Sequence, residues 1–175
     1  ERDETFWPIA LGGGSMFWSH GTNNARGVAV YINKKVDFKP IHSYRDEEGR
    51  MVVVVLDLKG QRISIANVYA PNPSFLANDI LAHQNFFEDL AIQLNTIKAQ
   101  HNVAETIIVG DFNTITNINL DAYGGNPRLY SKSLETIEVI KAEHGLCDIF
   151  RELNPDKRLC TFSPGGLIVS NMFRR

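Results

Sequence analysis

The segment IIVGDFNT, from Ile107 to Thr114, places an acid and an amide directly after an apolar run. Asp111 and Asn113 are two residues apart, so their side chains share one side if the backbone stays extended. A carboxylate can bind Mg²⁺ or orient a water, and a neutral amide can hydrogen-bond a phosphate oxygen without adding negative charge. The pair therefore suits phosphoester chemistry. The alternative is that both residues only form a turn after the strand, and the motif alone favours neither.

A second strand end, NVYAPN, presents the phenol of Tyr69. Pro71 follows it, and a proline turns the chain away from the sheet. A hydroxyl at a strand end can reach a pocket. Taken alone, Tyr69 is better explained as a tyrosine at the rim of the core whose hydroxyl bonds only backbone.

Alternating apolar residues and turn-forming residues predict the β-strands that should position these groups. Alternating apolar residues predict a strand over residues 27–33. Two β-rich runs, residues 51–58 and 62–69, predict a hairpin, because Gly60 after Lys59 can take the positive φ of a tight turn.

Two helices and a further strand are expected after this hairpin. Apolar residues at three- and four-residue steps predict an amphipathic helix over residues 78–100 that covers one face of a sheet. A second helix is predicted over residues 131–143, with Ser131 as its N-cap and Gly145 as its stop. The continuous apolar run at residues 105–110 predicts a strand buried on both faces. Hairpins interleaved with helices favour layered α/β packing.

Composition places the chain among globular proteins. Its 175 residues are 43% hydrophobic and 22% charged, which fits one domain over residues 1–175. The net charge of −2 gives no strong overall attraction to a polyanion. A nuclease that holds phosphate through a metal ion needs only a local basic patch, so this charge excludes neither DNA nor other phosphoesters.

Cysteine use and hydropathy give expectations about location. Cys147 and Cys160 have no paired spacing of the kind that makes a zinc site, so we expect reduced thiols and an intracellular protein, nuclear or cytoplasmic. No apolar run approaches the ~20 residues of a membrane span. A monomer without membrane contact is expected.

These residues resemble the endonuclease/exonuclease/phosphatase superfamily, and within it the apurinic-type endonuclease domain of LINE (non-LTR) retrotransposon polyproteins. The resemblance covers nearly the whole chain, in the family's order and approximate spacing. It implies an α/β (α+β) fold: a four-layered, deoxyribonuclease-like sandwich of two packed mixed β-sheets flanked by helices. The matching segments are SHGTNNARGVAVYINKKVDFKP, YRDEEGRMVVVVLDLKGQRISIANVYAPN, IIVGDFNT, NLDAY, GLCDIFRELNP and TFSPGG.

The resemblance also implies an activity: Mg²⁺-dependent (Mn²⁺ as an alternative ion) hydrolysis of a DNA phosphodiester. The nick leaves a 3′-hydroxyl that primes reverse transcription by a domain further along the polyprotein. Asp111 resembles the acid that orients and activates the attacking water, and Asn113 the amide that stabilises phosphate and nucleophile. Tyr69 resembles the phosphate-contacting tyrosine.

Other positions match the family with weaker implications. Thr161 corresponds to a hydroxyl near the substrate, or is simply a β-former. Asn24 and Arg26 precede a strand where they could approach DNA, although such residues are more often only solvated. Asp121 matches a family acid that holds a loop.

Two family segments have no counterpart in the sequence, so the resemblance implies a partial domain, truncated at both termini. The metal-binding glutamate of a QET-like segment is absent, and Glu1 and Glu4 do not match it. The terminal Ser-Asp-His is absent too, and the chain's five histidines are expected to be structural or solvated. The expected consequence is impaired catalysis, because hydrolysis depends on a bound metal and an activated water. An unpaired strand edge is a further expectation.

Three functions therefore stay open. The first is a metal-dependent DNA endonuclease. The second is a catalytically inactive retroelement remnant, or a module that binds DNA or protein. The third is a phosphatase acting on inositol lipids or other small phosphoesters, which shares the fold and the Asp/Asn pair.

Overall fold

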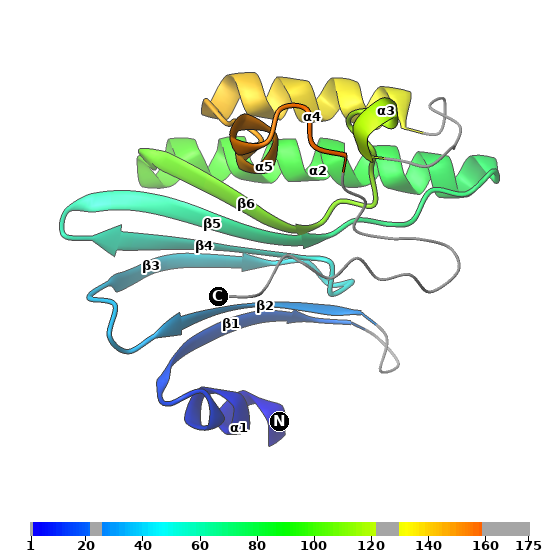
Figure 1. Ribbon diagram of the computed structural model, residues 1–175. Helices are drawn as coiled ribbons and strands as arrows, with labels where there is room; N and C mark the ends of the chain where they lie inside the picture. The colour runs from blue at the N-terminus through cyan, green and yellow to red at the C-terminus, as the bar shows by residue number, and fades with distance from the viewer. Residues whose placement is uncertain (1, 22–25, 122–129, 159–175) are drawn as a thin grey trace.

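The structure is a computed structural model that describes residues 2–21, 26–121 and 130–158. The chain folds into layers (Figure 1): two helices, a four-stranded sheet, a two-stranded sheet and an N-terminal helix. The layered α/β sandwich expected from the sequence is confirmed. The elements, in chain order, are α1 (Arg2–Ala10), β1 (Gly14–His20), β2 (Gly27–Asn33), β3 (Lys39–Arg45), β4 (Met51–Leu58), β5 (Gln61–Tyr69), α2 (Ala77–His101), β6 (Glu105–Asp111), α3 (Ile118–Asp121), α4 (Ser131–His144) and α5 (Ile149–Leu153).

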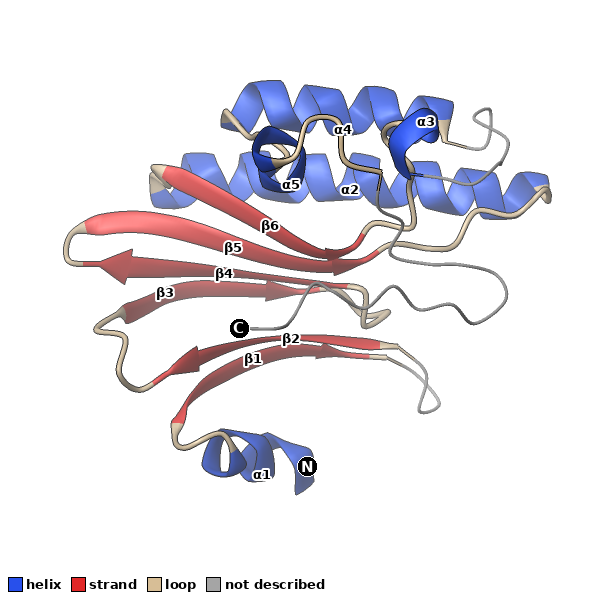
Figure 2. Cartoon of the chain, viewed as in Figure 1, coloured by secondary structure: helices blue, strands red, loops and turns tan. Residues whose placement is uncertain are grey.

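The larger sheet has the order β3-β4-β5-β6, with an antiparallel meander from β3 to β5 and a parallel β5–β6 pair. It is therefore the mixed sheet. The smaller sheet, within the described residues, is the antiparallel pair β1–β2. Figure 2 shows helices α2 and α4 on one side of the larger sheet and the β1–β2 pair on the other. The parallel step needs a long connection, and α2 supplies it.

Strand β4 forms the centre of the molecule, because both of its faces are covered. Val53 and Val55 pack with Phe87 and Leu90 of α2, and Val52 and Val54 pack with the β2 side chains. The four valines are at most 1% exposed. A strand buried on both faces reads as a continuous apolar run, which explains MVVVV in the sequence. Each buried valine contributes about 1.5 kcal/mol or more.

Most predicted elements are confirmed. The 27–33 strand is β2, the hairpin is β4–β5, and the two helices are α2 and α4. Lys59 (φ +55°) and Gly60 (φ +92°) form the left-handed turn of the hairpin. Gly145 ends α4 in the left-handed conformation as expected. Ser131 as N-cap is wrong: Tyr130 occupies that position, and Ser131 lies inside the helix.

The expected double burial of the strand at residues 105–110 is also wrong. In the described structure β6 is an edge strand, and Ile107 and Val109 are 46% and 45% exposed. Only the helix-facing side is partly covered, where Ile108 packs against the core and Thr106 bonds the Ser64 hydroxyl. Among the described elements, the β1–β2 pair packs mainly against β3, β4 and β5.

Candidate phosphoester site at the ends of β5 and β6

Tyr69 and Asp111 close the parallel β5–β6 ladder as its last register pair. Because the two strands run parallel, their carboxyl ends meet at one edge of the sheet, and the two side chains start from adjacent backbone positions. The amide of Ala70 donates to the Asp111 carbonyl oxygen at 2.9 Å, which continues the ladder one residue further. The structure thus brings together two residues that are 42 positions apart in the sequence.

Gly110 allows this close approach. Its φ is +124°, and a Cβ built on it would lie 2.0 Å from the Val68 carbonyl oxygen. Any other residue would therefore collide with β5 and adopt a backbone conformation that L-residues avoid. The glycine of the GDFN motif is explained by local packing between strands.

Asn113 bridges the two strand ends. Its backbone has φ +45°, its amide donates to Asp111 Oδ1 at 3.0 Å, and its side-chain Nδ2 donates to the Ala70 carbonyl at 2.8 Å. The extended backbone assumed from the sequence is wrong here, because the chain turns immediately after Asp111. The two hypotheses for Asp111 and Asn113, a turn after the strand and a phosphoester site, are therefore compatible. The Asp111 side chain forms the turn, and the turn fixes Asn113 beside the end of β5.

Arg50 adds a cation that sequence reasoning missed. Its guanidinium donates to the Tyr69 carbonyl oxygen at 3.1 Å and lies 5.4 Å from the centre of the Tyr69 ring. The Tyr69 amide in turn donates to the Arg50 carbonyl at 2.7 Å. The Arg50 Nε lies 3.4 Å from a Glu48 carboxylate oxygen. The signal that could have found Arg50 is its position just before β4, opposite the end of β5.

Asp46 holds the turn that carries Arg50. Its carboxylate accepts from the amides of Arg50 and Met51 at 2.9–3.1 Å and from the Ser19 hydroxyl at 2.6 Å. Ser19 lies on β1, so one carboxylate ties the smaller sheet to the turn before β4. The position of Arg50 beside Tyr69 therefore depends on contacts from both sheets.

The remaining predicted positions lie partly inside and partly outside the described residues. Arg26 pairs with Glu48 at 3.0 Å, and Glu48 also lies beside Arg50, so Arg26 is near Arg50. Asn24 and Thr161 lie outside the described residues. Asp121 binds the Asn117 amide and the Arg151 guanidinium, contacts that agree with the expected role in holding a loop.

The described residues do not form a complete site for a divalent ion. No group of three or more His, Cys, Asp or Glu side chains that could hold a metal occurs in residues 2–21, 26–121 and 130–158. Asp111, which is exposed, contributes a single carboxylate at the strand ends. A hard cation such as Mg²⁺ is held by one or two carboxylates together with waters and substrate oxygens, so Asp111 fits one ligand position of such an ion.

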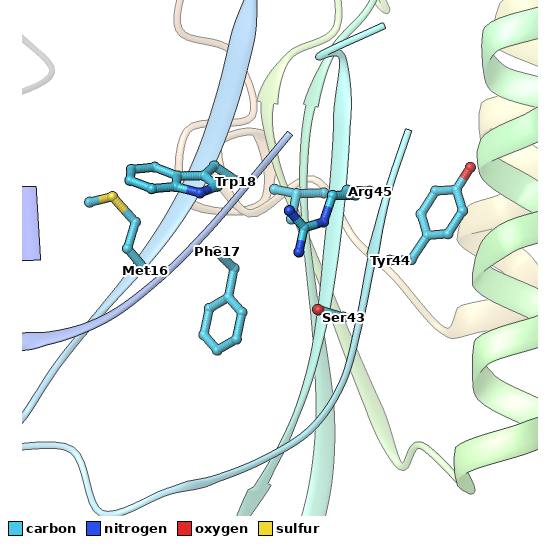
Figure 3. Close-up of a pocket in the computed structure, with 7 residues that line it drawn as sticks. Met16, Phe17, Trp18, Ser43, Tyr44 and Arg45 are labelled. Carbon is cyan, nitrogen blue, oxygen red and sulfur yellow. The ribbon is translucent and has the colours of Figure 1, made fainter. Parts of the chain in front are cut away.

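A separate small hollow lies between β1 and β3 (Figure 3). Met16, Phe17 and Trp18 line it from β1, and Ser43, Tyr44 and Arg45 line it from β3. In Figure 3 the Arg45 guanidinium lies on the β1 side of its strand, and Tyr44 points the other way, toward the helices. None of the residues at the β5 and β6 ends contributes to it. Tyr69 and Asp111 are both exposed, so the candidate site lies open at the surface. In the part of the chain that the structure describes, no helix is long and apolar enough to cross a membrane.

Comparison with known proteins identifies the fold. No family model matches the chain. The AP endonuclease LMAP from Leishmania major is similar, with a TM-score of 0.66 and 20% identity over 89% of this chain and 57% of that one. The 3′ phosphatase NExo from Neisseria, as a variant bound to product DNA hairpin, matches with a TM-score of 0.65 and 18% identity over 93% of this chain and 63% of that one.

The chain therefore has the layered, deoxyribonuclease-like sandwich fold of these two proteins. This chain spans less than two thirds of the length of either protein. At these identities the similarity establishes the fold, and the chemistry of this chain is argued from its own residues.

Proposed function

We propose that the chain is part of a Mg²⁺-dependent phosphodiester hydrolase that nicks DNA. The observation that carries the proposal is the Tyr69–Asp111 register pair bridged by Asn113, at a strand-end edge of this fold. It supports the proposal because residues that carry a carboxylate, an amide and a phenol start from neighbouring backbone positions at one edge of the sheet. The similarity to an AP endonuclease and to a phosphatase bound to DNA adds support.

Each residue has a proposed role. Asp111 orients the attacking water and accepts its proton. The water oxygen bonds to phosphorus as the bond from phosphorus to O3′ breaks, and the departing O3′ takes a proton from solvent, which leaves a 3′-hydroxyl and a 5′-phosphate. The Asn113 amide and the Tyr69 hydroxyl donate hydrogen bonds to phosphate oxygens as negative charge develops on them. Arg26, together with Asn24 and Thr161 outside the described residues, is a proposed contact to the DNA backbone.

A divalent ion, when bound, supplies positive charge at the phosphate and lowers the pKa of a water. Asp111 would hold such an ion together with water and phosphate oxygens, since the described residues contain no group of three or more His, Cys, Asp or Glu side chains around it. By its resemblance to LINE endonuclease domains, the protein would nick a chromosomal target, and the 3′-hydroxyl would serve a reverse transcriptase as primer.

Plasmid nicking tests the proposal. The purified chain is incubated with supercoiled plasmid and Mg²⁺ or Mn²⁺, with EDTA as the control. Relaxed circles that require the ion, and that disappear with Asp111→Asn, would support it. Supercoiled DNA that stays intact with clean protein would contradict it.

A DNA-binding module without catalysis is the second candidate. The observation that favours it is the missing acidic cluster among the described residues. In this case the chain binds a duplex with an affinity that falls as salt rises, and it leaves the DNA uncut. Binding of comparable strength in Mg²⁺ and in EDTA, without nicking, distinguishes this candidate from the enzyme.

A phosphatase for small phosphoesters or inositol lipids is the third candidate. The 3′ phosphatase among the similar structures favours phosphatase chemistry in general, although that protein was bound to product DNA. Phosphate release is measured from a 3′-phosphorylated duplex, from inositol phosphates and from p-nitrophenyl phosphate. Release from the small substrates without plasmid nicking would replace the endonuclease proposal with this one.

A further inference from the structure

The loop that carries Phe112, Asn113 and Thr114 has an anchor in the helical layer. His83 of α2 is completely buried, and its Nε2 lies 3.3 Å from the Phe112 carbonyl oxygen and 3.3 Å from Thr114 Oγ1. These two groups flank Asn113 on either side. One imidazole edge thus faces the backbone of the turn that holds the proposed site residues.

The other edge of the ring is fixed by α4. His83 Nδ1 lies 2.7 Å from the hydroxyl of Ser133, which is 1% exposed. The ring also packs edge-on against Phe87, with centroids 5.1 Å apart, and Phe87 stacks on Phe112 at 6.2 Å. Helices α2 and α4 therefore hold the loop in two ways. The Phe87 ring stacks on Phe112, and the His83 ring lies within hydrogen-bonding distance of the loop and of Ser133 on α4.

The partners determine the tautomer. A carbonyl oxygen only accepts, so the contact to Phe112 requires a proton on Nε2. Nδ1 then carries the lone pair, and the Ser133 hydroxyl donates to it. The opposite tautomer would set two lone pairs against each other at the Phe112 carbonyl, inside the core, where an unmatched polar group is costly.

We propose that His83, as the neutral Nε2–H tautomer oriented by Ser133, is a positioning residue that holds the Asp111–Asn113 turn in its observed geometry. Its ring bonds groups on either side of Asn113 rather than the Asp111 carboxylate, so it acts through the loop. The consequence for catalysis rests on the proposed function. The positioning itself does not, because it can be measured on the turn directly.

The first measurement is the tautomer in the unmodified chain. Long-range ¹H–¹⁵N correlation spectra of the histidine rings at neutral pH should show a protonated Nε2 and a bare Nδ1 for His83. In Ser133→Ala, which removes the donor to Nδ1, the Phe112 carbonyl still requires the proton on Nε2, so the Nε2–H form should persist. A wild-type ring with the proton on Nδ1 would overturn the proposal.

The second measurement is amide hydrogen exchange at Asn113, whose N–H is bonded to Asp111. His83→Leu replaces the imidazole with an apolar side chain of similar bulk that has no hydrogen-bond donor. It should speed exchange at Asn113 by about five- to tenfold, the equivalent of one hydrogen bond. His83→Gln restores a donor and should recover much of this loss. The amide of Val54 in the core reports global stability.

His144→Leu is the matched control. His144 is also a mostly buried histidine of the helical layer, but its ring faces Thr106. This variant should leave exchange at Asn113 unchanged relative to Val54. Equal acceleration of Asn113 and Val54 by His83→Leu, or none at Asn113, would show that His83 only fills the core and would overturn the proposal.

In a chain that nicks DNA, His83→Leu should lower kcat with little change in KM, and His83→Gln should restore most of it. If neither the wild type nor any variant nicks DNA, the proposed function fails. The tautomer and the exchange at Asn113 still decide the role of His83.

Discussion

The Tyr69 and Asp111 backbones lie side by side as the final pair of the parallel β5–β6 ladder, and the Asn113 side chain binds the residue after Tyr69. This relationship joins two motifs that are separated by the whole of α2. It also defines which substitutions should disturb the site and which should not.

Gly110→Ala should destabilise the fold strongly. The new Cβ would meet the Val68 carbonyl oxygen at 2.0 Å with φ at +124°, and such backbone strain costs about 1–3 kcal/mol before the collision is counted. Urea unfolding followed by circular dichroism measures the change in free energy. Gly60→Ala is the control: its φ is also positive, at +92°, but nothing lies within 4 Å of the added Cβ. A Gly110→Ala cost no larger than that of Gly60→Ala would contradict the close strand approach.

Asp46→Ala should separate the two sheets at the site end. The substitution leaves the amides of Arg50 and Met51 without their acceptor and removes one of the two acceptors of the Ser19 hydroxyl, a loss of about 1–3 kcal/mol. Asp46→Asn keeps one acceptor oxygen and should cost less. Thermal unfolding measures both variants, and equal melting temperatures for Asp46→Ala and the wild type would argue against this turn.

Arg50→Gln should weaken DNA binding. It removes a cation beside Tyr69, so the slope of log affinity against log salt should fall by about one phosphate contact. Fluorescence anisotropy with a labelled duplex at several salt concentrations measures this slope. Lys141→Gln removes a cation that pairs with Glu138 on α4 and should leave the slope unchanged. Equal slopes for wild type and Arg50→Gln would place the DNA elsewhere.

Stability should fall as pH falls below about 6.5. Desolvation by burial lowers the pKa of His42, His83 and His144 below the ordinary histidine value of 6.5, with further lowering of the His42 pKa by His101 and of the His144 pKa by Lys98. The unfolded chain therefore binds more protons than the folded one between each lowered pKa and 6.5, and the free energy of unfolding decreases as pH drops through that window.

Urea titrations at about pH 7.5, 6.5 and 5.5, on either side of the ordinary histidine pKa, measure this dependence. His83→Gln should reduce it, since the variant has no imidazole to protonate at that position. A free energy of unfolding that rises from the highest of these pH values to the lowest would contradict the burial of these histidines.

The sequence predicts best where the signal is local. Gly60 marks the hairpin turn, and the three- and four-residue spacing marks α2 and α4. The edge position of β6 is not local: Ile107 and Val109 look like core residues, and their exposure depends on where the β1–β2 pair lies. The Asn113 turn follows from the Asp111 side chain, which periodicity does not describe.

The candidate site shows the same difference between residues with a local sequence signal and residues whose role depends on distant parts of the chain. Tyr69, Asp111 and Asn113 could be selected from their places at strand ends, and the fold brings them together. Arg50 and His83 were missed because their roles depend on partners 19 or more positions away in the sequence. The partner of Arg50 is Tyr69, and the partners of His83 are Phe112 and Ser133. The place of Arg50 before β4 becomes a signal only once the β4–β5 pairing sets it opposite the end of β5, and a histidine on an amphipathic helix carries no signal of its own.

Cleavage of an end-labelled DNA duplex tests the central claim most directly. We predict that the chain with Mg²⁺ or Mn²⁺ produces fragments whose 3′-hydroxyl a polymerase can extend. Asp111→Asn should abolish them, whereas Asp57→Asn, at the far end of the sheet where Asp57 caps the hairpin turn, should not. A duplex left intact by the wild type, or cut equally by wild type and Asp111→Asn, would contradict a phosphodiesterase site at the ends of β5 and β6.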